Sequence, residues 1–314
     1  MRASGKSAAQ PQPAEWLAKP ERGSPRLLRF MATLSLRLGR RGSRWAIYAI
    51  AGYFFLFAPT ARRHARRYLT LALGRNPGAR DRFRHLLSFA TTIHDRVFLI
   101  NERDDLFDIS IEGEALMRSQ LDTGRGAFLM GSHLGSFEVV GAVGRRDPNL
   151  RVAMAMYERN AAKLNAILAA INPRASPDII PLGRIDAILT ISRRLDEGAV
   201  VGVLADRTLG REPLQAVTLL GERAQLPTGP MRMAAIMQRP VFFMAGLYRG
   251  KNRYHVVFES LADFSGTTTD TRAAAVGEAI DRYAAVLDRY CRSDPFNWFN
   301  FFDFWRPLPE QTDR

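Results

Sequence analysis

The chain has 314 residues, of which 46% are hydrophobic and 24% charged, and its formal net charge is +14 at pH 7. The high hydrophobic content and moderate charge exclude a disordered chain, and the length is sufficient for one large folded domain or two smaller ones. Cys291 is the single cysteine, which excludes an intrachain disulfide and favours a reducing compartment. No metal or cofactor is predicted, because Cys and His do not cluster at metal-ligand spacing and no Walker or dinucleotide-binding glycine pattern occurs.

All of the excess positive charge lies in the N-terminal third. Residues 1–100 contain 19 Lys and Arg but only four Asp and Glu, whereas the remainder has a net charge of −1. Nucleic-acid binding is not predicted, because base-stacking and groove-reading motifs are absent and the arginines flank an apolar run. A membrane surface fits this distribution better.

Composition divides the chain into three regions. Residues 1–25 are rich in Ser, Pro, Gln and Ala without periodicity, which predicts a flexible tail. Residues 26–120 are predicted to form an N-terminal helical, membrane-associating region, and residues 121–314 an α/β core. We expect residues 26–314 to form one domain.

The N-terminal region contains an uncharged run, Trp45–Ala58, of 14 residues. Spanning a bilayer takes about 20 such residues, and no cleavage site follows, so neither a spanning helix nor a secretory signal is the first expectation. The run lies between two arginine clusters: Arg37, Arg40, Arg41 and Arg44 before it, and Arg62, Arg63, Arg66 and Arg67 after it. This pattern favours an anchor lying in the membrane interface, with arginines against anionic headgroups. A buried core helix with a solvated basic neighbour is the alternative, and whether the run spans or lies on a membrane stays open.

From Gly126 onward, strand and helix patterns alternate. Strands are predicted at Ala127–Gly131, Arg151–Tyr157, Ile179–Pro181, Val200–Ala205, Val241–Tyr248 and Tyr254–Glu259. Helices are predicted at Phe137–Gly144, Ala161–Ile171, Arg184–Asp196, Gly229–Gln238 and Thr271–Arg292. The alternation predicts an α/β fold with a mostly parallel central sheet flanked by helices, whose ligands gather at the carboxyl ends of strands.

The segment Phe128–Glu138, FLMGSHLGSFE, joins a predicted buried strand to a predicted helix. Ser136 is a candidate N-cap, which would put Glu138 in the first helical turn, where the helix dipole favours a carboxylate. His133 would lie on the loop at the strand end, with Glu138 close enough to orient its imidazole. A histidine held in this way can take a proton from a hydroxyl, although a structural hydrogen bond would leave the same pattern.

Further charged and capping residues follow other predicted strands. Arg159 comes after the second strand and is suited to a phosphate or carbonyl oxygen. Asp206 and Arg207 follow a buried-looking strand, where an internal ion pair is the alternative to a functional role. Thr228 and Gly229 begin a predicted helix, whose backbone amides are suited to an oxyanion or a phosphate.

The aromatic stretch Phe296–Trp305, FNWFNFFDFW, lies near the end of the chain. Its density of Phe and Trp would suit an acyl-chain groove, docking on a membrane, or a hydrophobic clasp that closes the core. The sequence leaves these alternatives open.

Several blocks occur in an order that resembles a known family. They are the YFFLF segment with its Arg-rich helix, the H-x4-E block of His133 and Glu138, the strand ending in Tyr157 with Arg159, the strand ending in Asp206, and the PTGP turn Pro227–Pro230. From about Ala46 to Trp305 the chain resembles the bacterial lipid A biosynthesis (lauroyl/myristoyl) acyltransferases of the lysophospholipid acyltransferase-like superfamily. The H-x4-E spacing alone is weakly specific, and the order of five blocks is much stronger.

The resemblance implies transfer of a fatty acyl group from an acyl carrier protein or coenzyme A thioester to a hydroxyl of a lipid acceptor, without an acyl-enzyme. It implies His133 as general base and Glu138 as the group that holds the imidazole. It associates Asp206, Arg207 and Arg159 with the acceptor headgroup or the framework of the site. With the residues of the two helix starts, the predicted substrate-binding set is Ser136, Arg159, Asp206, Arg207, Thr228 and Gly229. The expected location is the cytoplasmic face of the cell inner membrane.

The chain also departs from the family pattern. Members acting on lipid A commonly have a longer N-terminal apolar segment, and the FNFFDFW ending is similar to that of relatives acting on other lipids or pigments. The acceptor therefore stays open. The alternative function is a non-catalytic lipid-binding or acyl-carrier-binding protein of the same fold.

Overall fold

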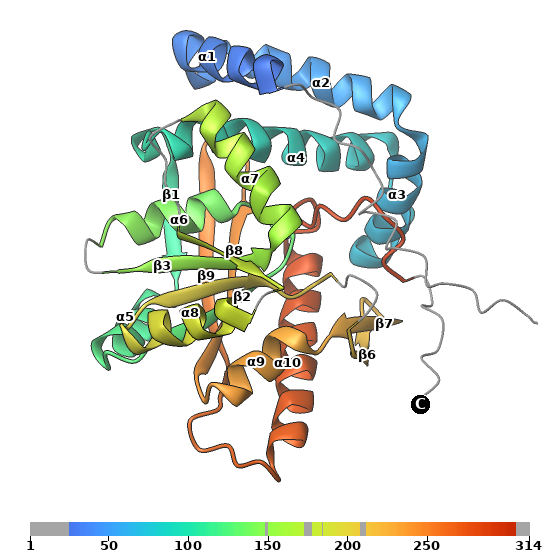
Figure 1. Cartoon of the computed structure of the whole chain (residues 1–314). Coiled ribbons are helices and arrows are strands. Elements are labelled where there is room, and N and C mark those ends of the chain that lie inside the picture. The colour runs from blue at the N-terminus through green and yellow to red at the C-terminus, as the bar shows by residue number, and fades with distance from the viewer. Residues whose placement is uncertain (1–24, 148–149, 173–177, 184, 208–211, 306–314) are drawn as a thin grey trace, which may run out of the picture.

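The structure is a computed structural model that describes residues 25–147, 150–172, 178–183, 185–207 and 212–305. Residues 1–24 of the predicted tail lie outside these residues. Arg184, where a helix was predicted to start, also lies outside them. Within them, strands and helices alternate along the chain, as Figure 1 shows.

A seven-stranded sheet, in the order β1-β9-β8-β2-β5-β3-β4, forms the centre of the described structure. Its strands are β1 Asp108–Glu112, β2 Ala127–Gly131, β3 Val152–Tyr157, β4 Asp178–Leu182, β5 Val200–Leu204, β8 Pro240–Tyr248 and β9 Arg253–Asp263. Neighbouring strands are parallel except for the antiparallel pair β8–β9. The predicted α/β class with a mostly parallel sheet is confirmed.

Helices cover both faces of the sheet (Figure 1). They are α1 Pro25–Gly42, α2 Arg44–Phe57, α3 Pro59–Leu73, α4 Ala79–Ile100, α5 Glu114–Asp122, α6 Phe137–Arg145, α7 Glu158–Ile171, α8 Ile185–Asp196, α9 Gly229–Ile236 and α10 Arg272–Ser293. The predicted boundaries from β2 to α10 agree with these within a few residues. A hairpin of β6 (Leu214–Leu219) and β7 (Glu222–Pro227) was not predicted, because its apolar and polar residues do not alternate cleanly.

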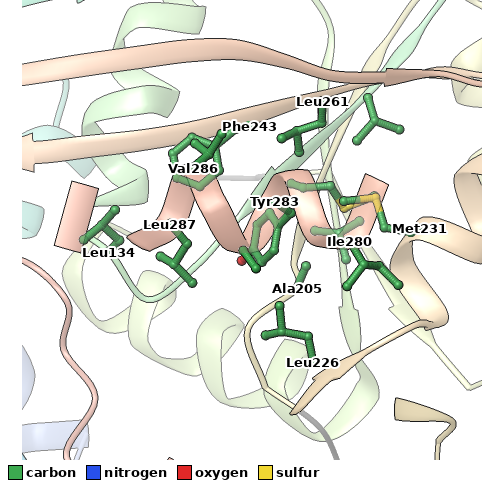
Figure 2. Packing of buried hydrophobic residues seen from close by; sticks show 14 of the residues in the cluster. Leu134, Ala205, Leu226, Met231, Phe243, Leu261, Ile280, Tyr283, Val286 and Leu287 are labelled. Carbon is green, nitrogen blue, oxygen red and sulfur yellow. The ribbon is translucent and has the colours of Figure 1, made fainter. Parts of the chain in front are cut away.

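Residues of the central strands alternate between two apolar cores. In β2, Phe128 and Met130 belong to the core on the α10 face, whereas Ala127 and Leu129 belong to the core shared with α4 and α6. Figure 2 shows the first core, where Leu134, directly after His133 in sequence, lies near Leu287 of α10. A strand buried on both faces reads as a continuous apolar run, which is why β2 was predictable from sequence.

The helices α1 and α2 lie across α4 at the top of Figure 1. None of the helices in the described ranges is both long enough and apolar enough to cross a membrane. Arg40 of α1 forms a bidentate contact with the fully buried Asp95 of α4, at 2.7 and 2.8 Å. The expectation that Arg40 faces headgroups is therefore wrong, because a buried carboxylate requires a paired cation.

Candidate active site

The register of β2 and β5 brings His133 and Asp206 together. Gly131 at the end of β2 lies opposite Leu204 at the end of β5, and both polar residues come two positions later. Adjacent parallel strands lie about 4.8 Å apart, so residues equally far past paired ends face each other across one edge.

Asp206 holds His133 at two points. One carboxylate oxygen accepts the His133 backbone N–H at 2.9 Å, and the other lies 2.9 Å from the imidazole Nδ1. The indole Nε1–H of Trp298 donates a third bond to this carboxylate, at 3.2 Å. Asp206 is fully buried, whereas the His133 side chain is 30% exposed. With Nδ1–H donated to a carboxylate, the other ring nitrogen, Nε2, keeps a free lone pair.

The charges at this pair favour a neutral imidazole beside an ionised carboxylate. Burial lowers the pKa of His133, and Arg207 lowers it further, against the raising effect of Asp206. Burial acts to raise the pKa of Asp206, but its interactions with His133 and Arg207 outweigh this and hold that pKa below its usual range. At neutral pH, His133 is therefore unprotonated at Nε2 and can accept a proton.

Glu138 was predicted to orient the His133 imidazole, but in the structure it contacts Arg96 and Ser136 instead. Glu138 lies in the first turn of α6, as predicted, but its carboxylate contacts Arg96 of α4 at 2.6 Å. Its other oxygen accepts a hydrogen bond from the Ser136 hydroxyl at 2.9 Å. Ser136 is the N-cap residue of α6, as predicted. Asp206, which was predicted to bind substrate, holds the imidazole instead, because a side chain on the facing strand end reaches Nδ1 directly.

The C-terminal aromatic segment supports the His133 loop from behind. The backbone N–H of Phe299 donates to the His133 carbonyl at 2.8 Å, and the Asn297 carbonyl accepts the Gly135 N–H at 2.9 Å. Trp298 is fully buried and pairs with Leu134 in an isolated antiparallel bridge. Of the three alternatives for this segment, the structure supports the clasp. Sequence reasoning missed its contact with the site, because the segment is about 160 residues from His133 in sequence.

Two glycines allow the loop to approach β8. Gly135 has a φ of +78°, and a Cβ there would lie 2.1 Å from the carbonyl oxygen of Gly246. A Cβ on Gly246 would lie 2.3 Å from the Ser136 carbonyl oxygen. The Ser136 N–H donates to that Gly246 oxygen at 2.8 Å. Only glycine at both positions permits this close approach.

Arg207 lies beside the pair and contacts the C-terminal segment. It donates to the Phe299 carbonyl at 3.2 Å, and its guanidinium lies 5.0 Å from the ring centre of Phe302. Burial lowers its pKa to about 10, against the effect of Asp206, so it stays cationic at neutral pH. A buried cation at this edge stabilises negative charge that develops nearby.

The other predicted site residues are not brought to His133 by any contact in the described residues. Thr228 is the N-cap residue of α9, and its N–H and hydroxyl both donate to the Pro213 carbonyl, at 3.0 and 3.2 Å. A Cβ on Gly229 would lie 3.1 Å from a Glu212 carboxylate oxygen. Arg159 lies in the first turn of α7, but its side chain is outside the described residues. Substrate binding by these three residues stays a prediction.

A cavity of about 480 Å³ lies between the sheet and the helices α5 and α6. Its wall is mostly apolar and includes Leu129, Phe137, Val140, Gly202 and Met244. A Cβ on Gly131, two residues before His133, would lie 2.7 Å from Phe137 and 3.2 Å from Met244. The cavity therefore reaches the layer of side chains next to the His133 loop. Its size and lining are those of a site for an apolar small molecule.

Two comparisons with known proteins give lipid acyltransferases. The sequence model of a family described as bacterial lipid A biosynthesis acyltransferase matches residues 26–306. The chain is also similar to a phosphatidylinositol mannoside acyltransferase of Mycolicibacterium smegmatis, with 26% identity over 211 residues. That similarity covers 66% of this chain and 64% of the relative, so the chain spans less than two thirds of the relative's length.

Proposed function

The chain belongs to the bacterial lipid A biosynthesis acyltransferase family, and from this membership we propose that it moves a fatty acyl group from a thioester to a lipid hydroxyl. The observation that carries the proposal is the His133 imidazole, whose Nδ1 is held by Asp206 and whose Nε2 has no hydrogen-bond partner among the described residues. Nε2 takes the proton of the acceptor hydroxyl as its oxygen attacks the thioester carbonyl. The tetrahedral intermediate then expels the thiolate, which takes the proton from the His133 imidazolium, and the new ester is released without an acyl-enzyme.

The donor that we propose is a thioester of acyl carrier protein or coenzyme A. An acyl carrier protein is acidic, and the excess of arginine in residues 1–100 would attract it. The acceptor is a membrane lipid with a free hydroxyl, either a lipid A precursor or another lipid. Comparing the lipids of cells with and without the protein by mass spectrometry tests this function. One lipid class should lose one acyl group, and identical lipid profiles would count against the proposal.

The cavity beside Phe137 is the place that we assign to the fatty acyl chain. Val140 of α6 lines it, and Val140→Phe would remove room for about two methylene groups. Each buried methylene contributes about 0.8 kcal/mol, so kcat/KM for a long donor should fall about tenfold relative to a donor four carbons shorter. Ile188→Phe, on the exposed side of α8, is the control. If Val140→Phe leaves the preference between the two donors unchanged, the cavity does not hold the fatty acyl chain.

The helix α2 is the surface that we propose for contact with the membrane. Seven of its large apolar side chains are exposed: Trp45, Tyr48, Ile50, Tyr53, Phe54, Leu56 and Phe57. Arg41 is exposed next to them, and the Arg62 guanidinium lies 5.9 Å from the Phe55 ring centre. Apolar side chains beside arginines suit the boundary between anionic headgroups and acyl chains. We propose that this surface lies on the cytoplasmic face of the inner membrane.

Replacing Leu56 and Phe57 with Gln should weaken binding to vesicles that contain anionic lipid by more than tenfold. These side chains are 63% and 66% exposed, so the fold does not depend on them, while burying each in lipid contributes about 1.5–3 kcal/mol. Leu189→Gln on α8, where the leucine is 68% exposed, is the matched control and should bind as the wild type does. Cosedimentation measures the difference. Equal binding by all three proteins would show that α2 is not the membrane contact.

A further inference from the structure

The carboxylate of Glu138 connects two helices beside the His133 loop. It contacts Arg96 of α4 at 2.6 Å and accepts the Ser136 hydroxyl at 2.9 Å. The Arg96 and Glu138 side chains are 21% and 15% exposed. A partly buried ion pair is less screened by water and salt than a surface pair, so it holds its two helices more firmly.

The helix α4 is itself firmly held, which makes it a frame for the loop. Asp95, the residue before Arg96, is fully buried between Arg40 of α1 and the Tyr254 hydroxyl of β9, which donates to it at 2.8 Å. His85, earlier in α4, is bonded through Nε2 to the Trp298 carbonyl at 2.9 Å. The contacts of His85 and Asp95 fix this part of α4, so Arg96, which directly follows Asp95, has little freedom to move.

The loop is held on its other sides by groups that do not involve α4. Asp206 holds His133, the Asn297 carbonyl holds Gly135, and the Gly246 carbonyl holds the Ser136 N–H. The Ser136 hydroxyl, in contrast, is fixed only by the Glu138 carboxylate among the hydrogen bonds of the described residues. The contact from Arg96 through Glu138 to Ser136 therefore sets where the last residue of the loop lies relative to α4.

We propose that Glu138 is a positioning residue, which sets the place of the His133 loop through its contacts with Arg96 and Ser136. The inference rests on the proposed acyl transfer. It assigns the two carboxylates near His133 to different tasks: Asp206 acts on the imidazole, and Glu138 acts on the loop that carries it. Displacing a catalytic group by a fraction of an ångström lowers the rate of the chemical step without changing the basicity of the group.

A double-mutant cycle on Arg96 and Glu138 tests this role. Glu138→Gln and Arg96→Gln should each lower kcat about tenfold with less than a twofold change in KM. The double variant should be no slower than either single one, because both remove the same contact. Arg96→Lys keeps the cation and should retain more than half of the wild-type kcat. The acid limb of the pH profile of kcat/KM should stay where it is in the wild type.

Asp81→Asn is the matched control, because Asp81 is a first-turn carboxylate of α4 paired with Arg75 at 2.7 Å. Its kcat should stay within twofold of the wild type. Additive losses in the double variant, a normal kcat in Arg96→Gln, or a shifted acid limb in Glu138→Gln would each overturn the positioning role. If the wild type itself transfers no acyl group, the proposed function fails. If it turns over and the variants do not differ from it, only the positioning role fails.

Discussion

Asp206→Asn should lower kcat by about 10³–10⁴-fold while the protein stays folded. Asparagine keeps an oxygen that can accept the His133 N–H or the Trp298 indole N–H, so the loop and the C-terminal segment remain attached. What is lost is the charge that fixes the Nδ1–H tautomer and stabilises the imidazolium formed when the hydroxyl proton is taken. Thermal unfolding checks the fold, and steady-state kinetics measure kcat.

The pH profile of this variant separates an effect on the imidazole from general damage. In the wild type, burial and Arg207 lower the pKa of His133, and Asp206 opposes them. Removing the carboxylate removes the opposing effect, so the pKa of His133 falls further. A base with a lower pKa stays unprotonated at lower pH, and the acid limb of kcat/KM should therefore move to lower pH. An unmoved limb, or one at higher pH, would contradict the contact between Asp206 and the working imidazole.

His133→Ala should lower kcat by at least about 10³-fold, since general base catalysis contributes about 10²–10⁴-fold and no described neighbour can replace it. Alanine also leaves the buried Asp206 without its imidazole partner, which costs stability. His133→Asn avoids this problem, because its amide N–H can donate to Asp206 while it offers no base. Both variants should lose activity, and only the alanine variant should unfold at lower temperature.

His255→Ala is the control for this pair of variants. His255 also has a carboxylate on its ring, with Nε2 lying 3.0 Å from a Glu112 oxygen, but it belongs to β9, two strands away from β2. Its loss should leave kcat within twofold of the wild type. Activity that survives in His133→Asn would exclude His133 as the base.

Sequence reasoning predicted most of the sheet and the place of His133. The buried strands Ala127–Gly131 and Val200–Leu204 are short apolar runs, with polar or charged residues within two positions of their ends, and that pattern depends on local sequence alone. The order of the motif blocks also predicted the family, which the match over residues 26–306 confirms.

The partner of the imidazole was harder to predict. The spacing of His133 and Glu138 places both near one strand-to-helix turn, but it does not determine where the carboxylate points. That depends on Arg96, a residue of a helix about 40 positions earlier, which draws Glu138 toward α4. Asp206 could have been found from the β2–β5 register, because both residues lie two positions past the paired strand ends. The support from Trp298 has no local signal, because it arises only when the chain folds back on itself.

The most direct test of the central claim follows an isotopically labelled acyl group. The full-length protein is mixed with a labelled acyl thioester and membrane lipids, and the products are separated by mass spectrometry. The account predicts label in an ester of a lipid hydroxyl with the wild type, no labelled protein, and no labelled lipid with His133→Asn. Label that stays on the thioester, or leaves it only as free fatty acid, would contradict acyl transfer by the His133–Asp206 pair.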